Sequence, residues 1–248
     1  MMKNNKKLKT ALIVFIVILA LLLCFNVGVY AAYALAATEV SYTKPGTSTT
    51  ISVKDALDEL NKKVPTKSIG DEVTVGGEQF YVLEWDNNCD TVNLISKYNL
   101  NPAGTAQQNA ERKTTTCAFS STNYWGSSYT SSPFNLNDFI GYTATDAIGK
   151  AKSYGRSKGA VSSRLLSYEE ANALKSKASS NTKINTMLWG KANSANGYLY
   201  YWLGSAKTKG SVWYVSGRYN YFEESYYGRD EDGMGVRPVI TVLKSKIS

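Results

Sequence analysis

The chain has 248 residues, enough for one sizeable domain with attachments or for two small domains. Its net charge is +8, but Lys3, Lys6, Lys7 and Lys9 supply half of that excess, and no other element carries the clustered Lys and Arg of a nucleic-acid-binding protein. Histidine is absent, which excludes a Ser-His-Asp triad and a His-ligated zinc site.

The N-terminal segment, residues 1–37, predicts a membrane anchor. Residues 11–25 form an unbroken apolar run that continues with few interruptions to Ala37, and about 20 such residues span a bilayer. The lysines before the run place the N-terminus in the cytoplasm and the rest of the chain outside. The Ala34-Leu35-Ala36 segment also fits a signal-peptide cleavage site, but the length of the run favours an uncleaved anchor. We expect a single-pass membrane protein with an extracellular domain, secreted if the leader is cleaved.

Residues 38–66 predict a stalk. Residues 43–50 have loop composition, and Ser52 followed by Asp55 gives a capping-box-like start to one short helix that Pro65 ends. Its apolar stripe needs a partner, either the following domain or another stalk.

The remaining chain, residues 67–248, predicts one domain that opens with strands at 71–75, 79–85 and 91–98. Gly76-Gly77 indicates a tight hairpin between the first two. The polar stretch 99–140 lacks periodicity, so we expect a long loop that scattered aromatic residues fix to the core. Cys89 and Cys117 lie in this exported part, where a disulfide between them can persist, although two free cysteines remain the alternative.

Two helices are expected next. Thr145 caps the first, which runs to about Tyr154, and Gly155 ends it. Ser167 and Glu170 form the capping box of the second.

The C-terminal part, residues 198–242, predicts three aromatic and β-branched strands at 198–205, 212–215 and 235–242. We expect Arg237 to be buried and paired with Glu169 or Glu170. The side chains expected in the core are Trp202, Leu203, Trp213 and Val215.

The segment 217–230 is too polar for a core and too aromatic for a linker. Its mixture of Tyr, Asn, Ser, Gly and Arg is typical of binding surfaces. We predict that this loop contacts the ligand through Arg218, Tyr219, Asn220, Tyr221, Tyr226, Tyr227 and Arg229, while some of its aromatic rings only pack.

Three motifs in order resemble the formylglycine-generating-enzyme branch of the C-type-lectin-like fold. They are the helix start at 164–170 (Arg-Leu-Leu-Ser-Tyr-Glu-Glu), the strands at 201–205 and 212–215, and the closing Gly-Val-Arg-Pro-Val at 235–239. The chain departs from the family pattern at Leu166, where Pro is favoured, and at Val236, where Phe is usual. The segments 39–42 and 53–60 resemble a stalk found in anchored surface proteins of Gram-positive bacteria.

The resemblance implies an α+β fold with short antiparallel strands and two helices, but it does not carry catalysis. The enzymes of this branch resemble copper oxidases that use two cysteines late in the domain, and no cysteine follows Cys117. The sugar-binding signatures of calcium-dependent lectins are also missing. Glu223 and Glu224 are strand or loop neighbours that point apart, so a catalytic carboxylate pair is not expected. The acidic turn 230–233 could offer oxygen ligands to Ca²⁺ but lacks the ligand spacing of an EF-hand, so a solvated turn is expected and bound Ca²⁺ is the alternative.

The sequence therefore predicts an adhesin-like module on the cell surface that binds a glycan or a surface protein, without enzymatic activity, cofactor or nucleic acid. The alternatives are an enzyme of the formylglycine-generating type, which the missing cysteines disfavour, and a structural subunit of a surface fibre.

Overall fold

The computed structural model describes residues 41–43, 48, 50–52, 55, 66–110, 115–190, 197–228 and 234–248. The chain divides into two units, Met1–Pro65 and Thr66–Ser248. In the first unit, β1 (Ser41–Thr43) pairs antiparallel with β2 (Thr50–Ser52), a hairpin that the sequence does not predict. The Asp55 backbone N–H donates to the Ser52 hydroxyl at 3.0 Å, and that hydroxyl donates to the Asp55 carboxylate at 2.8 Å, which confirms the predicted Ser52 cap.

The predicted membrane anchor and the body of the stalk helix lie outside the described residues. Within the described ranges, no helix has both the length and the apolar character that a bilayer crossing requires.

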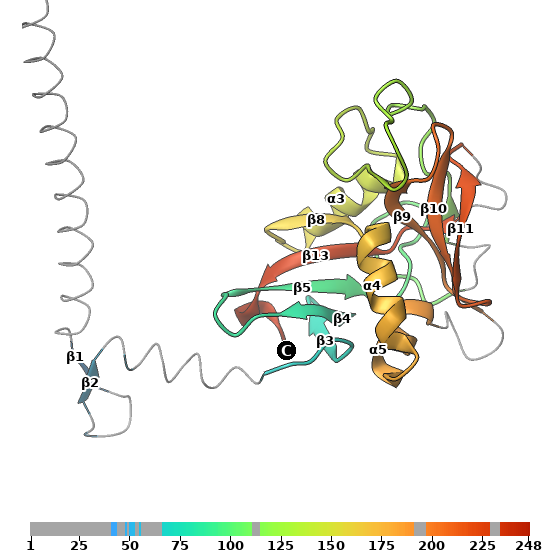
Figure 1. Ribbon diagram of the computed structural model, residues 1–248. Helices are drawn as coiled ribbons and strands as arrows, with labels where there is room; N and C mark the ends of the chain where they lie inside the picture. Colours follow the sequence, from blue (N-terminus) through green and yellow to red (C-terminus); the bar gives the residue numbers. More distant parts are fainter. Residues whose placement is uncertain are drawn as a thin grey trace, which may run out of the picture. The chain divides into compact units, whose positions relative to one another are not determined.

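The second unit is an α+β fold with two sheets and three α-helices in its described part (Figure 1). The five-stranded sheet is antiparallel and has the order β3 (Glu72–Val75), β4 (Glu78–Trp85), β5 (Thr91–Ser96), β13 (Pro238–Leu243) and β8 (Ser162–Leu165). The predicted glycine turn joins β3 to β4, and both Gly76 and Gly77 have positive φ, as a tight hairpin turn requires.

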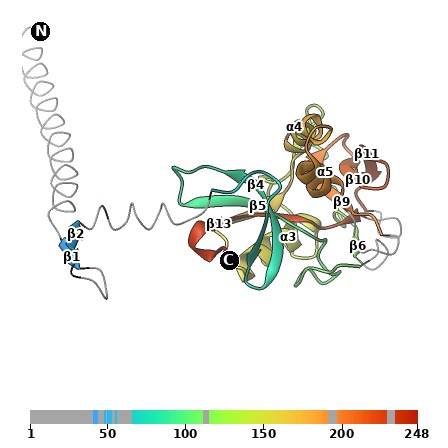
Figure 2. The same cartoon turned by 90° about the horizontal axis from the view of Figure 1, so that it is seen from below.

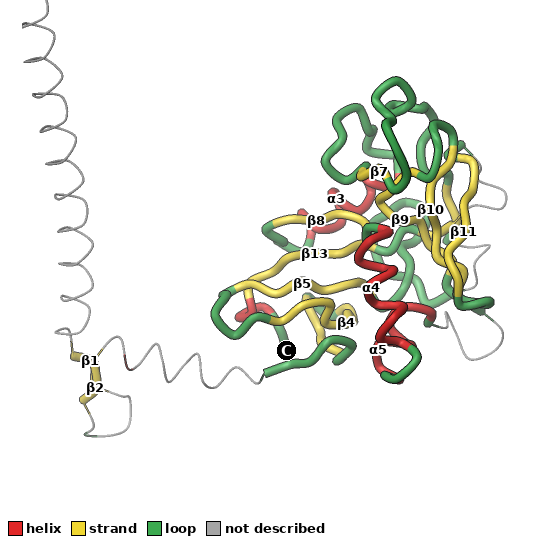
Figure 3. The backbone as a smooth tube through the Cα atoms, viewed as in Figure 1, coloured by secondary structure: helices red, strands yellow, loops and turns green. Residues whose placement is uncertain are grey.

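The six-stranded sheet has the order β11 (Tyr221–Tyr226), β10 (Ser211–Ser216), β9 (Tyr200–Ala206), β12 (Met234–Gly235) and β6 (Thr116–Cys117), with β7 (Phe134–Asn135) also paired to β9. All its pairs are antiparallel except β12 with β9. Among the described residues of the loop predicted at 99–140, the strands are β6 and β7, of two residues each, and Figure 3 draws most of this stretch as loop.

Helix α3 (Ala147–Ser157) packs against β8 and β13, and Gly155 lies so close to Ser163 that a side chain would collide there. The helix ends at Ser157, two residues past the predicted end at Gly155. Its N-cap is Asp146 rather than Thr145.

Helices α4 (Tyr168–Ala178) and α5 (Thr182–Trp189) form an adjacent pair, seen from a second direction in Figure 2. The Ser167–Glu170 capping box of α4 is confirmed. The sequence predicts no helix where α5 forms, so the described part of this unit has three α-helices rather than the two predicted.

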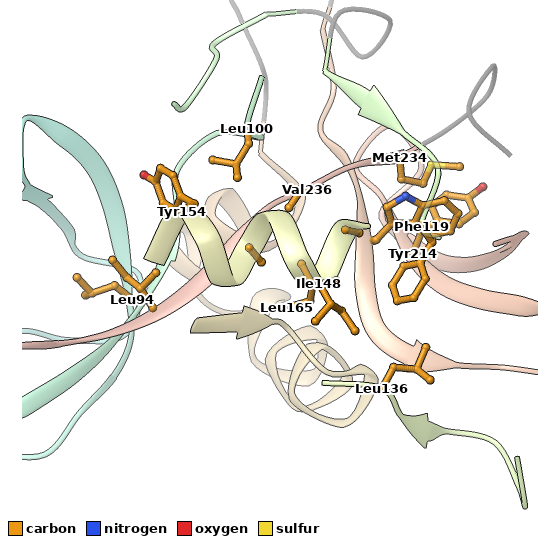
Figure 4. Packing of buried hydrophobic residues seen from close by; sticks show 14 of the residues in the cluster. Leu94, Leu100, Phe119, Leu136, Ile148, Tyr154, Leu165, Tyr214, Met234 and Val236 are labelled. Atoms are coloured by element: carbon orange, nitrogen blue, oxygen red, sulfur yellow. The ribbon is translucent and has the colours of Figure 1, made fainter. Parts of the chain in front are cut away.

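Buried side chains form two core clusters. One joins the two sheets to α3 and includes Leu94, Phe119, Ile148 and Met234 (Figure 4). The other joins α4 and α5 to the sheets, and Ile95 belongs to it because successive strand residues point to opposite faces. The aromatic residues of the long loop fix it to the first cluster as predicted, since Phe119 and Trp125 are fully buried.

Candidate functional site

The predicted binding loop 217–230 is a tight turn followed by the strand β11, so its description as a loop is wrong. Gly217 lies against the carbonyl groups of Trp189 and Leu199, which leaves no space for a side chain. Asn220 has a φ of 56°, and its N–H donates to the Ser216 carbonyl at 3.0 Å. Asn tolerates this left-handed conformation better than most residues, so Asn220 has a conformational role in the turn.

Two of the predicted tyrosines present their rings to solvent. Tyr219 in the turn and Tyr226 at the end of β11 have 56% and 54% of their surface exposed. Tyr219 stacks on Tyr221, with ring centroids 5.6 Å apart, and Tyr226 lies beside Tyr227 at 4.4 Å. Each exposed ring is thus held by a neighbouring ring.

Some of the other predicted residues are exposed, whereas others pack against the core and form a scaffold for the exposed ones. Arg218 is exposed, and its guanidinium lies 5.2 Å from the Tyr219 ring. Tyr227 packs on the buried Trp125 at 5.4 Å, so it belongs to the scaffold, as does Phe222, which packs on Trp189 at 5.3 Å. Arg229 and the acidic turn 230–233 lie outside the described residues.

A tyrosine–glutamate cluster on β10 and β11 holds one side of this surface together. Glu223 is paired across the strands with Tyr214, whose hydroxyl donates to its carboxylate. The Tyr221 hydroxyl donates to the same carboxylate at 3.0 Å. This hydrogen bond raises the pKa of Tyr221, because the negative carboxylate favours the protonated phenol. The sequence does not show this cluster, since it depends on the register between the two strands.

Glu224 points to the opposite face of the strand. Its carboxylate accepts hydrogen bonds from Lys207 at 2.8 Å and Ser211 at 2.5 Å, and the contact with Lys207 contributes most to lowering its pKa. The two glutamates therefore do not form a carboxylate pair, as expected from strand alternation. Among the described residues, no group of three His, Cys, Asp or Glu could hold a metal ion.

Trp213 is not fully buried, in contrast to Trp202, Leu203 and Val215, which lie in the core as predicted. One contact of its ring is with Tyr168, at 4.5 Å between centroids, and another is with the Lys207 ammonium group at 4.7 Å. These contacts fix the indole in place and make it part of the scaffold beside β11.

Arg237 is fully buried, but its predicted pairing with Glu169 or Glu170 is wrong. Its Nε donates to the Ser96 carbonyl and its Nη1 to the Met187 carbonyl, both at 2.6 Å. Glu170 instead forms a bidentate ion pair with Arg164. A single sequence does not reveal that the Arg237 guanidinium donates to backbone carbonyl groups of β5 and α5 instead of to a carboxylate.

The predicted disulfide is absent, since Cys89 and Cys117 are both free. Cys89 lies in the turn between β4 and β5, whereas Cys117 lies in β6 of the other sheet. A disulfide requires Cα atoms within about 7 Å, so two cysteines on different sheets are poorly placed to form one. The short separation of Cys89 and Cys117 in the sequence therefore does not predict that they lie close together in the fold.

Comparison with known proteins gives no family to which the chain can be assigned: no protein-family model, curated protein or solved structure matches it.

Proposed function

We propose that the chain is a membrane-anchored, extracytoplasmic binding module whose ligand lies along the turn 217–220 and β11. Two exposed tyrosines support this proposal: Tyr219 in the turn before β11 and Tyr226, the last residue of β11. Exposed aromatic rings that neighbouring rings hold in place lose little side-chain entropy on binding, which favours their use as contact residues.

The spacing of the two rings defines the shape of the ligand. Tyr221 and Tyr226 are five strand residues apart, which corresponds to about 17 Å at the rise of an antiparallel strand. Tyr219 lies further along in the turn and stacks on Tyr221. Because Tyr221 and Tyr226 are an odd number of strand residues apart, their side chains point to opposite faces of β11. A ligand that contacts both exposed rings therefore lies along the edge of the strand and is extended, as a glycan chain or a protein segment is.

The fold and location in this proposal rest on the sequence. The ordered motifs from 164 to 239 support a C-type-lectin-like domain, and they fall on β8, α4, β9, β10 and the start of β13. The basic and apolar leader supports display outside the membrane. No cysteine follows Cys117, which weighs against catalysis of the formylglycine-generating type.

The test is the double substitution Tyr219→Ala with Tyr226→Ala in the full-length chain, purified in a mild detergent and applied to arrays of glycans, mucins and surface proteins. We expect at least a tenfold loss of affinity, about 1.4 kcal/mol, with an unchanged melting temperature. The matched control is Ile140→Ala with Val161→Ala, because these apolar side chains are 85% and 68% exposed and lie outside β11. Equal binding by both double variants would place the ligand elsewhere.

A further inference from the structure

The outer edge of β11 has no pairing partner among the described residues. The strand is the last in the six-stranded sheet, and all six of its residues pair with β10 on one side (Figure 1). No hydrogen bond from the described residues reaches the other side of its backbone. Such an edge presents a row of unpaired N–H and C=O groups to which a further strand can bind.

The other sheet edges in the described part of this unit are covered or short. Ser248 covers β3, since it and Thr74 exchange two backbone hydrogen bonds, each of 3.1 Å. β8 has four residues, and its Ser163 hydroxyl donates a hydrogen bond to the Ala151 carbonyl of α3. β6 and β7 have two residues each. Among the strands that the structure describes, β11 is therefore the long edge to which no other described segment is paired.

We propose that an extended, basic segment of another protein binds by adding a strand to the outer edge of β11. This inference rests on the proposed binding function and identifies the class of ligand for the same surface. Backbone hydrogen bonds along β11 provide affinity, and side chains at alternate positions provide specificity. Tyr219 and Tyr226 contact the two ends of the added strand.

The charges on β11 make a second copy of the chain a less favourable partner for this edge than a basic strand of another protein. Antiparallel pairing of β11 with itself in full register places Glu223 opposite Glu224, and like charges directly opposite each other are destabilising. Shifting the pairing by one residue brings a glutamate opposite its own copy. The strand thus disfavours self-association by a charge device common on edge strands.

The same charges favour a cation on the ligand. Lys207 forms an ion pair with Glu224, but no described basic side chain forms an ion pair with Glu223, whose carboxylate accepts hydrogen bonds from the hydroxyl groups of Tyr214 and Tyr221. A Lys or Arg of an added strand beside Glu223 supplies that counter-charge. An anionic glycan would meet an uncompensated carboxylate at the same place.

The test uses seven-residue peptides of alternating β-branched and polar residues, with Lys or with Glu at the polar positions, and the full-length chain in a mild detergent. We expect the Lys peptides to bind and the Glu peptides to bind at least tenfold more weakly. Two N-methylated versions of a binding peptide distinguish strand addition from side-chain contact. Alternate N–H groups of a strand face the same neighbour, so methylation of one alternate set abolishes binding and methylation of the other set is tolerated.

Glu223→Gln keeps the size of the side chain and removes its charge, so we expect at least tenfold weaker binding of the Lys peptides. Glu72→Gln is the matched control, since Glu72 also lies in an antiparallel strand and is exposed. Equal effects of the two N-methylated sets, or equal binding of Lys and Glu peptides, would overturn the inference. Binding to glycans alone would overturn it and leave the binding function intact, whereas binding to no peptide, glycan or protein would remove both.

Discussion

Tyr154, which is buried in the first core cluster, and Tyr124, which is half-buried and packs against that cluster, differ in what surrounds their hydroxyl groups. The Tyr154 hydroxyl donates to the Glu78 carboxylate at 2.7 Å. The Tyr124 hydroxyl is buried and has no hydrogen-bond partner among the described residues. Burial raises the pKa of both phenols, so both stay protonated in the folded protein.

We predict opposite effects on stability when each hydroxyl is removed. Tyr124→Phe removes an unsatisfied polar group and should raise the free energy of unfolding by about 1 kcal/mol. Tyr154→Phe breaks a hydrogen bond to a charged acceptor and should lower it by about 1.5–3 kcal/mol. Urea unfolding of the two variants provides the comparison. A loss of stability in Tyr124→Phe similar to that in Tyr154→Phe would show that the Tyr124 hydroxyl has a partner.

The free cysteines lead to a second prediction at this scale. Cys89 is exposed, although its thiol donates to the Asp86 carboxylate, which raises the pKa of the thiol. Cys117 is half-buried, and burial raises the pKa of its thiol, although nearby Lys150 opposes this shift. Alkylation of the folded chain under non-reducing conditions, followed by peptide mass spectrometry, should therefore label the more accessible Cys89 faster than Cys117, with a difference that disappears after unfolding. A linked Cys89–Cys117 peptide would restore the disulfide that the sequence suggests.

At the scale of elements, local patterns predict those strands and helices whose signals lie within a few residues. β-Branched and aromatic residues on both sides of Gly76-Gly77 indicate β3 and β4, and Ser167 with Glu170 fixes the start of α4. β11 was not predicted because its apolar and charged residues occur on both faces, so the strand depends on its register with β10.

Only part of the candidate site can likewise be predicted from local sequence. Its composition identified Tyr219 and Tyr226 as surface residues, but it could not separate them from Tyr227, which packs on a tryptophan about a hundred residues earlier. The cluster around Glu223 is likewise set by cross-strand pairing. Composition thus locates a binding surface, whereas strand register decides which of its side chains reach the ligand.

One side chain joins several elements of the first core cluster and gives a prediction for acid stability. Glu78, the first residue of β4, accepts hydrogen bonds from Lys158, from the Gln107 N–H at 2.8 Å and from Tyr154. Burial raises the pKa of Glu78, but these hydrogen bonds together outweigh that effect and lower it. Because the pKa of Glu78 is lower in the folded protein than its ordinary value of 4.5, the Glu78 carboxylate stabilises the fold above pH 4.5. That contribution to the free energy of unfolding is lost as the pH falls through the pKa that Glu78 has in the folded protein.

We therefore expect Glu78→Gln to lower the free energy of unfolding at pH 7 by about 1–3 kcal/mol and to flatten its decline below pH 4.5. The measurement is urea unfolding between pH 3 and 7. Glu84→Gln serves as the control because that carboxylate accepts from Asn93 at the exposed surface of β4. Parallel curves for Glu78→Gln and the wild type would contradict the expected role of the Glu78 charge.

At the scale of the whole molecule, the chain separates into two units at Pro65 and Thr66, and the proposed ligand surface lies entirely on the second. Such a division suits a protein in which one unit attaches and the other binds. β1, β2 and the Ser52 cap show local order before the boundary, so the sequence between the predicted anchor and the domain is more than a linker.

The last prediction concerns the orientation of the two units across a membrane. Lys3, Lys6, Lys7 and Lys9 precede the apolar run 11–37, and basic residues remain on the cytoplasmic side when a helix inserts. The unit Thr66–Ser248 should then face outward, where a ligand on another cell or surface can reach β11. Protease added to intact cells should remove epitopes of this unit and spare a tag placed before Met1, whereas lysis should expose both to cleavage. Protection of residues 66–248 until lysis would place the open edge of β11 inside the cell and would contradict the proposed role at the cell surface.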